Sequence, residues 1–213
     1  MTRHAQSERL QLCDELDRLG PDEPTMCGGW DTRDLAAHLV IREGRPDLAV
    51  GRLVPFLAGR LEREQRRMAQ GDYPALVQRV RDGAPVWNPM AHPKVDELTN
   101  LIEYFVHHED VRRAQAGWQP RELPAALQGK LWSALKRSSR LMFRKSATGI
   151  VLIGEGQGRY AAKLPDEHGT VVLRGTPAEL VLYAYGRKSV ARVEFEGDAD
   201  DIAVLQKAEL GLS

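Results

Sequence analysis

The sequence has few cysteines, no net charge and no long apolar run. Its two cysteines, Cys13 and Cys27, are too few for a disulfide framework and too far apart for a paired-cysteine zinc knuckle. Thirty basic side chains balance thirty acidic ones, so the chain lacks the broad positive field that binding to a phosphate backbone requires. No apolar run approaches the ~20 residues that cross a bilayer, and the N-terminal residues lack the apolar region of a signal peptide. We therefore expect a soluble cytoplasmic protein that binds neither nucleic acid nor membrane.

The first two thirds of the sequence has helical periodicity. Apolar residues recur at three-residue steps from Leu10 to Leu19 and predict a helix over 7–19, which Gly20 and Pro21 end. Further helices are predicted over 31–43, 47–53, 57–70, 73–81, 95–115 and 124–145. The N-terminal helix, the capped helix that starts at Asp31 and the two long later helices indicate an antiparallel bundle over residues 1–146.

The pattern changes near residue 147. Runs of β-branched residues over 149–154 and 170–173 predict strands, as does the alternation over 192–196. Helices are predicted over 177–185, where Thr176 is the expected N-cap, and over 198–210. Strands interleaved with helices indicate a small α+β domain over residues 147–213. The expected fold class is therefore α+β, a helical bundle followed by a small mixed domain.

Three residues in the helical part have the chemistry and spacing of a metal site. Glu103 and His107 are four residues apart, so on a helix they lie on the same face and can reach one ion together. His38 is the best third candidate, because Leu35 and Leu39 mark its side of the helix as facing inward. Two histidines and one carboxylate leave a coordination position open, as in a catalytic zinc site.

Each of these residues also has an ordinary structural interpretation. A glutamate four residues before a histidine is often a weak surface contact, and a histidine among leucines is often a core residue. His108 points about 100° away from His107 on a helix and is expected to be exposed or packed. Cys27 precedes the capped helix, and His38 lies about two turns inside that helix, ~10 Å along its axis, so Cys27 is expected to be an incidental thiol rather than a ligand.

Three separated segments resemble one known family. They are GWDTRDLAAHL over 29–39, EYFVHHEDVRRA over 103–114 and VLRGTPAELVLYAYGR over 172–187, the last followed by VEFEGD over 193–198. Together they resemble the mycothiol-dependent maleylpyruvate isomerase family, which belongs to the DinB-like metal-binding four-helix bundles. The string VHHEDVRRA further resembles an actinobacterial subfamily of it.

The resemblance implies roles for individual residues. The family's zinc ligands correspond to His38, Glu103 and His107 in this sequence. Asp110 lies one turn beyond His107, where it would orient a ligand or a metal-bound water, although a role on the helix surface or in capping is an equal alternative. Arg187 matches the family's Gly-Arg step, where it would face an anionic substrate or serve a structural role at a helix end.

The resemblance also implies an activity. The chain is expected to bind a divalent ion, with zinc favoured over nickel and manganese, and to use mycothiol or another small thiol. It would act as an isomerase or transferase on a small electrophilic substrate, since coordination to a metal makes a thiol a thiolate at neutral pH. The alternatives are a metal-dependent hydrolase, with Glu109 or Asp110 as its general base, and a non-catalytic metal-binding or regulatory protein. A monomer and a homodimer are both compatible with the pattern.

Overall fold

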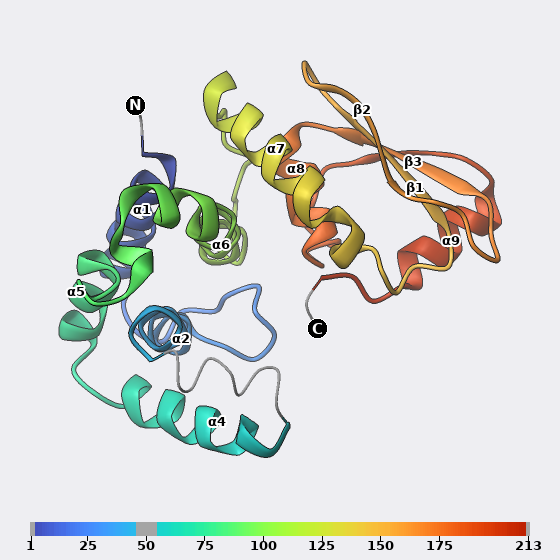
Figure 1. The fold of residues 1–213 in the computed structure, drawn as a ribbon. Helices are drawn as coiled ribbons and strands as arrows, with labels where there is room; N and C mark the ends of the chain where they lie inside the picture. Colours follow the sequence, from blue (N-terminus) through green and yellow to red (C-terminus); the bar gives the residue numbers. More distant parts are fainter. Residues whose placement is uncertain (1–2, 46–54, 212–213) are drawn as a thin grey trace. The chain divides into compact units, whose positions relative to one another are not determined.

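The computed structural model describes residues 3–45 and 55–211, and the chain divides into two compact units, Met1–Pro120 and Arg121–Ser213 (Figure 1). The helix expected over 47–53 lies outside the described residues. No described helix is long and apolar enough to cross a membrane. The fold class is α+β, as the sequence predicts, with helices in the first unit and a sheet with helices in the second.

The first unit is built from helices. Its elements are α1 (His4–Leu19), α2 (Thr32–Gly44), α4 (Pro55–Ala69), α5 (Tyr73–Asp82), the short 3₁₀ helix η2 (Pro89–Ala91) and α6 (Pro93–Arg113). One core joins buried side chains of α1, α2, α5 and α6, among them Leu12, Leu35, Val77 and Tyr104. In Figure 1, α1 lies alongside α6, and α5 lies near both α1 and α2.

The second unit consists of α7 (Ala125–Met142), a sheet and two further helices. The strands β1 (Gly149–Gly154), β2 (Gly158–Lys163), β3 (Thr170–Gly175) and β4 (Glu194–Glu196) lie in the order β2-β1-β3-β4. β1 pairs antiparallel with β2 and parallel with β3, and β3 pairs antiparallel with β4. Helix α8 (Pro177–Ala184) connects β3 to β4, and α9 (Ala199–Lys207) follows β4.

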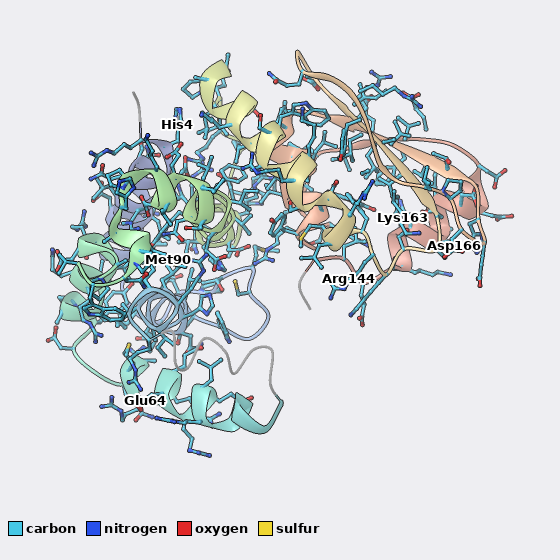
Figure 2. All side chains as sticks on the ribbon, in the orientation of Figure 1. His4, Glu64, Met90, Arg144, Lys163 and Asp166 are labelled. Carbon is cyan, nitrogen blue, oxygen red and sulfur yellow. The ribbon has the colours of Figure 1, made fainter. Side chains whose placement is uncertain are left out.

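Helix α7 packs within the second unit and not in the bundle as the sequence analysis expected. The ring of Trp132 meets that of Tyr160 on β2 edge-on at 6.5 Å, and Gln128 Oε1 accepts a hydrogen bond from the backbone N–H of Ala178 on α8. After α7, Arg144 (labelled in Figure 2) donates from Nη1 to the carbonyl oxygens of Leu141 and Gly211. The compact units divide between residues 120 and 121, whereas the change in the sequence pattern lies near residue 147.

Most other predicted elements are present to within a few residues, but β2 was missed. Its residues GRYAAK are mostly exposed or half-buried and carry no apolar alternation. The signal that could have found it is the turn before it, where Gly156 and Gly158 have positive φ angles of 68° and 98°. Such glycines are typical of a tight hairpin.

Candidate metal centre

The position of His38 is set by the first turn of helix α2, where side-chain and backbone hydrogen bonds fix the residue at which the helix begins. The Asp31 side chain accepts a hydrogen bond from the backbone N–H of Asp34, and the Asp34 carboxylate accepts one from the Asp31 N–H, which makes a capping box. The Thr32 hydroxyl also donates to the Gly20 carbonyl oxygen at 2.5 Å, which ties the start of α2 to the end of α1. His38 then lies about two turns into the helix and is 7 % exposed.

Helix α6 supplies the other two candidate ligands, of which His107 is buried and Glu103 is partly exposed. Its side chains from Tyr104 to Val111 are all buried, whereas Leu98, nearer the start of the helix, is 64 % exposed. The polar side of α6 near His107 therefore lines the inside of the bundle and does not face solvent.

The three predicted ligands converge on one point. His38 Nε2 and His107 Nε2 each lie 3.3 Å from the same oxygen, Glu103 Oε1. One donor atom from each of the three residues lies within 4.8 Å of the others. Two helices thus bring together the two-histidine, one-carboxylate set that the spacing predicts.

These separations suit a metal ion. Zinc bonds of about 2.0–2.1 Å in a tetrahedral arrangement place neighbouring ligand atoms roughly 3.3 Å apart, which matches both nitrogen–oxygen distances. A direct N–H···O hydrogen bond is usually shorter, about 2.9–3.0 Å. The donor types also match, because imidazole nitrogens and a carboxylate oxygen are standard zinc ligands.

An arginine and two histidines surround the Glu103 carboxylate. Burial alone would raise its pKa, but hydrogen bonds from His107 and His38 and the nearby charge of Arg42 outweigh burial and hold the pKa well below its usual range. Arg42 Nε lies 3.1 Å from Glu103 Oε1. Glu103 is therefore a carboxylate at neutral pH, as a metal ligand must be.

His107 has a second partner on its other ring nitrogen. Its Nδ1 lies 2.9 Å from Asp110 Oδ2, and the Asp110 side chain is fully buried. Burial would lower the pKa of His107, but hydrogen bonds with Asp110, Cys27 and Glu103 raise it well above its usual value. Because a carboxylate can only accept, the Nδ1 proton points to Asp110, and Nε2, which faces the Glu103 carboxylate, also carries a proton in the metal-free chain.

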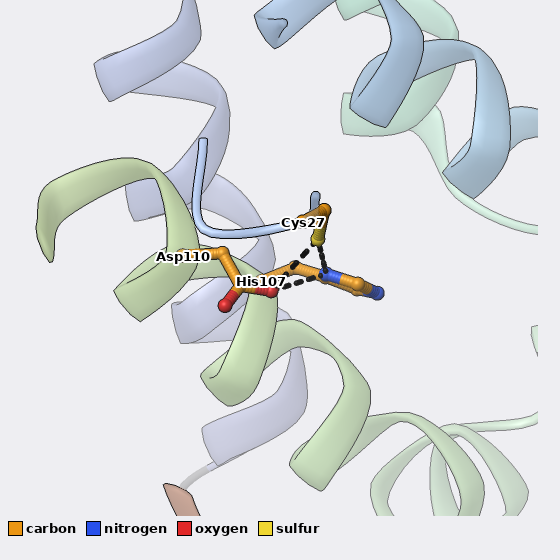
Figure 3. A group of neighbouring side chains, drawn as sticks. All are labelled: Cys27, His107 and Asp110. Carbon is orange, nitrogen blue, oxygen red and sulfur yellow. Dashed lines mark hydrogen bonds and ion pairs between the residues drawn. The ribbon is translucent and has the colours of Figure 1, made fainter. Parts of the chain in front are cut away.

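Cys27 corrects the sequence analysis, which placed it away from the site. Its Sγ lies 3.1 Å from Asp110 Oδ2 and 3.6 Å from His107 Nδ1, as Figure 3 shows. Cys27, His107 and Asp110 form a second group that could hold a metal ion. The expected distance was wrong because the segment from Pro21 to Trp30 folds back onto α6 and does not continue the axis of α2.

The remaining sequence candidates have clear positions. His108 is buried, with Nδ1 2.9 Å from Glu8 Oε2, so it packs as one of the two expected alternatives. Glu109 is buried and accepts hydrogen bonds from Arg112 and Arg113. Arg187 lies in the second unit, just after α8, and its Nη1 donates to the Tyr185 carbonyl oxygen at 2.7 Å. A role for Arg187 toward a substrate stays a prediction.

A buried polar network adjoins the candidate centre and was not predicted. Arg42 donates to Asn100 Oδ1 at 2.5 Å, and Asn100 donates to Glu43 Oε1. Glu43 also accepts two hydrogen bonds from the Arg9 guanidinium. The network links α1, α2 and α6 beside the three candidate ligands.

Comparisons with known proteins identify the fold. No protein-family model matches the chain, and no curated protein matches it by sequence. Crystal structures of the mycothiol-dependent maleylpyruvate isomerase and of a histidine-to-alanine mutant of it match over 91 % of this chain and 90 % of theirs, each with a TM-score of 0.59 and 16 % identity. The chain therefore has the fold of that isomerase, as the resemblance in the sequence predicts.

Proposed function

We propose that the first unit binds one divalent metal ion, with zinc favoured, through His38, Glu103 and His107. The observation that carries this proposal is the approach of both imidazole Nε2 atoms to one carboxylate oxygen at 3.3 Å, the spacing of ligands around a tetrahedral ion. Three protein ligands leave a position open for a small molecule, which is typical of a catalytic site.

The side chains around the ligands would prepare them for an ion. Arg42 holds the Glu103 carboxylate, and Asp110 holds the Nδ1 proton of His107, so Nε2 is the nitrogen that would give up its proton when the ion binds. The Trp30 ring lies 5.1 Å from the His38 ring and packs against it. Ordered ligands lower the entropic cost of binding the ion.

We further propose that the open position serves a thiol-dependent isomerase or transferase. A bound divalent ion would supply the charge that turns a thiol into a thiolate nucleophile at neutral pH. The support is the shared fold with an isomerase described as mycothiol-dependent. Mycothiol or another small thiol is the proposed co-substrate, the substrate is a small electrophile, and Arg187 is the proposed contact for an anionic group of that substrate.

The arrangement of carboxylates favours this reaction over hydrolysis. A hydrolase needs a general base free to accept a proton, and Glu109 and Asp110 were the candidates. Glu109 is engaged by two guanidinium groups, and Asp110 Oδ2 already accepts from His107 and lies beside Cys27 Sγ. Both carboxylates are therefore poorly suited to taking a proton from water.

A cobalt-substituted chain tests the proposal. Adding mycothiol or another small thiol to the cobalt form should produce a sulfur-to-cobalt absorption band in the near ultraviolet, and Glu103→Gln should weaken cobalt binding. The same band must appear in Cys27→Ser, which shows that the sulfur comes from the added thiol. A cobalt form whose spectrum ignores every thiol, and which cleaves esters or amides without one, would contradict the thiol-dependent activity.

A further inference from the structure

The loop between α1 and α2 holds Cys27 in a fixed place. The backbone N–H of Met26 donates to the carbonyl oxygen of Asp110 at 3.0 Å, which ties the loop to α6. The Trp30 N–H donates to the Cys27 carbonyl oxygen at 2.8 Å, and the Cys27 N–H donates to Thr25 Oγ1 at 3.2 Å. The thiol therefore lies on an ordered turn attached to the helix that carries His107.

The thiol adds a second hydrogen bond to the carboxylate that orients His107. Asp110 Oδ2 accepts from Cys27 Sγ–H at 3.1 Å and from His107 Nδ1–H at 2.9 Å (Figure 3). Asp110 has no exposed side-chain surface, so bulk water does not reach its carboxylate while Cys27 is in place. A buried carboxylate held by two donors has little freedom to rotate away from the imidazole.

Cys27, His107 and Asp110 also have the donor types of a metal site. The number of protons and lone pairs on the His107 ring decides whether the three bind a second ion or hold His107 in place. A neutral imidazole has one N–H and one lone pair. Once Nε2 is a ligand at the His38–Glu103–His107 centre, Nδ1 keeps its proton and has no lone pair for a second ion. Nδ1–H then needs an acceptor, which Asp110 supplies at 2.9 Å.

We propose that Cys27 is a positioning residue for the metal centre. Its S–H fixes Asp110, Asp110 holds the Nδ1 proton of His107, and His107 Nε2 is thereby directed at the ion. The inference rests on the proposed metal centre and assigns a role to a residue that does not touch the ion. One short segment then orders both imidazoles, because Trp30 packs against the His38 ring while Cys27 acts on His107 through Asp110.

The proposal predicts a graded loss of metal affinity. Loss of an outer partner of a ligating histidine weakens binding by roughly 10–100-fold. Cys27→Ala removes the donor and is expected to weaken zinc binding about 10-fold, at the lower end because Asp110 itself remains. Cys27→Ser keeps an O–H donor in the same place and should recover most of that loss. Cys13→Ala is the matched control, since Cys13 is buried elsewhere and its Sγ lies near Val77 O.

The experiment measures zinc affinity of the full chain by competition with a chromophoric chelator, for wild type and the three variants. Circular dichroism verifies that each variant is folded, and cobalt spectra report the ligands. The expected order is wild type and Cys13→Ala tightest, then Cys27→Ser, then Cys27→Ala, with no band from Cys27 sulfur bound to cobalt. Should Cys27→Ala fail to fold, Cys27→Ser still tests the positioning role, because it is expected to lose only a small part of the zinc affinity.

Three results would overturn the positioning role. They are equal affinity in Cys27→Ala and wild type, a serine variant that binds as weakly as the alanine variant, and a sulfur-to-cobalt band in wild type that Cys27→Ser lacks. The last result would make Cys27 a direct ligand. A wild-type chain that takes up no ion would overturn the metal centre as well, so failure of the centre is distinguished from failure of the positioning role alone.

Discussion

Replacing Arg9 with methionine tests the buried ion-pair network beside the metal centre. Arg9 on α1 binds both carboxylate oxygens of Glu43 on α2, at 2.8 and 3.0 Å, and Asp96 on α6 at 2.8 Å. The side chains of Arg9 and Glu43 are 6 % and 4 % exposed. Methionine fills much of the space of the arginine stem but leaves both carboxylates without their cation.

The expected cost is large relative to the stability of a domain. Breaking a buried ion pair by removing one partner costs about 3–5 kcal/mol, against a total of about 5–15 kcal/mol for a typical domain. Asn100 and Tyr104 still donate to Glu43 Oε1, at 2.8 and 2.9 Å, which favours the lower end of that range. Removing both charges, in Arg9→Met with Glu43→Met, should cost less than the sum of the single changes by about 1–3 kcal/mol.

Urea unfolding followed by circular dichroism measures these free energies on the full chain. Arg33→Met is the matched control, because Arg33 pairs with Asp22 at the surface and such pairs contribute at most about 1 kcal/mol. The reasoning would be refuted if Arg9→Met were no more destabilising than Arg33→Met. It would also be refuted if the effects of Arg9→Met and Glu43→Met simply added.

Three further predictions follow from local features. Asp31→Ala removes the N-cap of α2 and should lower the unfolding free energy by about 1 kcal/mol and weaken zinc binding. Asp72→Ala, which removes the N-cap of α5, should lower stability to a similar extent and leave zinc affinity unchanged. Unfolding measures the stability of both variants, and chelator competition measures their zinc affinity. Gly149→Ala should destabilise the chain by about 1–3 kcal/mol, because its Cβ would lie 2.7 Å from Pro165 N, while Gly28→Ala, which has open space, should not; thermal unfolding distinguishes the two. The raised pKa of His107 stabilises the metal-free fold below a pH of about 6.5, and that stability is lost as the pH rises through the raised pKa. Zinc binding displaces protons, so the zinc-bound fold should become more stable as the pH rises. Plots of the unfolding free energy against pH, with chelator and with excess zinc, should therefore have opposite slopes above that pH, and parallel slopes would contradict the coupling.

The candidate ligands could be predicted because their information is local. Glu103 and His107 share a helix face by spacing alone, and Leu35 and Leu39 mark the side of the helix on which His38 lies. The resemblance of short segments to one family then assigned residues of both helices to a single site. In the structure, His38, Glu103 and His107 lie close together. Periodicity identifies a helix face well, because each residue's direction follows from the helix geometry.

Cys27 could not be placed, because a loop has no period. The path from Pro21 to Trp30 depends on backbone hydrogen bonds such as Met26 N–H to the Asp110 carbonyl oxygen, and on Gly29 with a φ of 80°. The two glycines after Cys27 were a signal of a turn, but not of its direction. The distance between Cys27 and His38, counted along the axis of α2, was therefore a wrong guide to the position of the thiol.

The packing partners of α7 and of Arg9 also depend on information that a helical pattern lacks. An apolar stripe such as the one containing Leu131 and Trp132 shows that a helix buries one face, but not against which elements. A charged residue such as Arg9 is assigned to the surface unless its partner is known, and Glu43 lies 34 residues away. Tertiary contacts decide both cases.

Metal content is the most direct test of the account. Plasma mass spectrometry on tag-free chain should find about one zinc or similar ion per chain in the wild type, as expected for a single three-ligand site. His38→Ala and His107→Ala should lose the ion, while His168→Ala, which alters a partly exposed histidine of the second unit, should keep it. A wild-type chain that stays metal-free after reconstitution with zinc, nickel and manganese, or equal metal in all four proteins, would contradict the proposed centre.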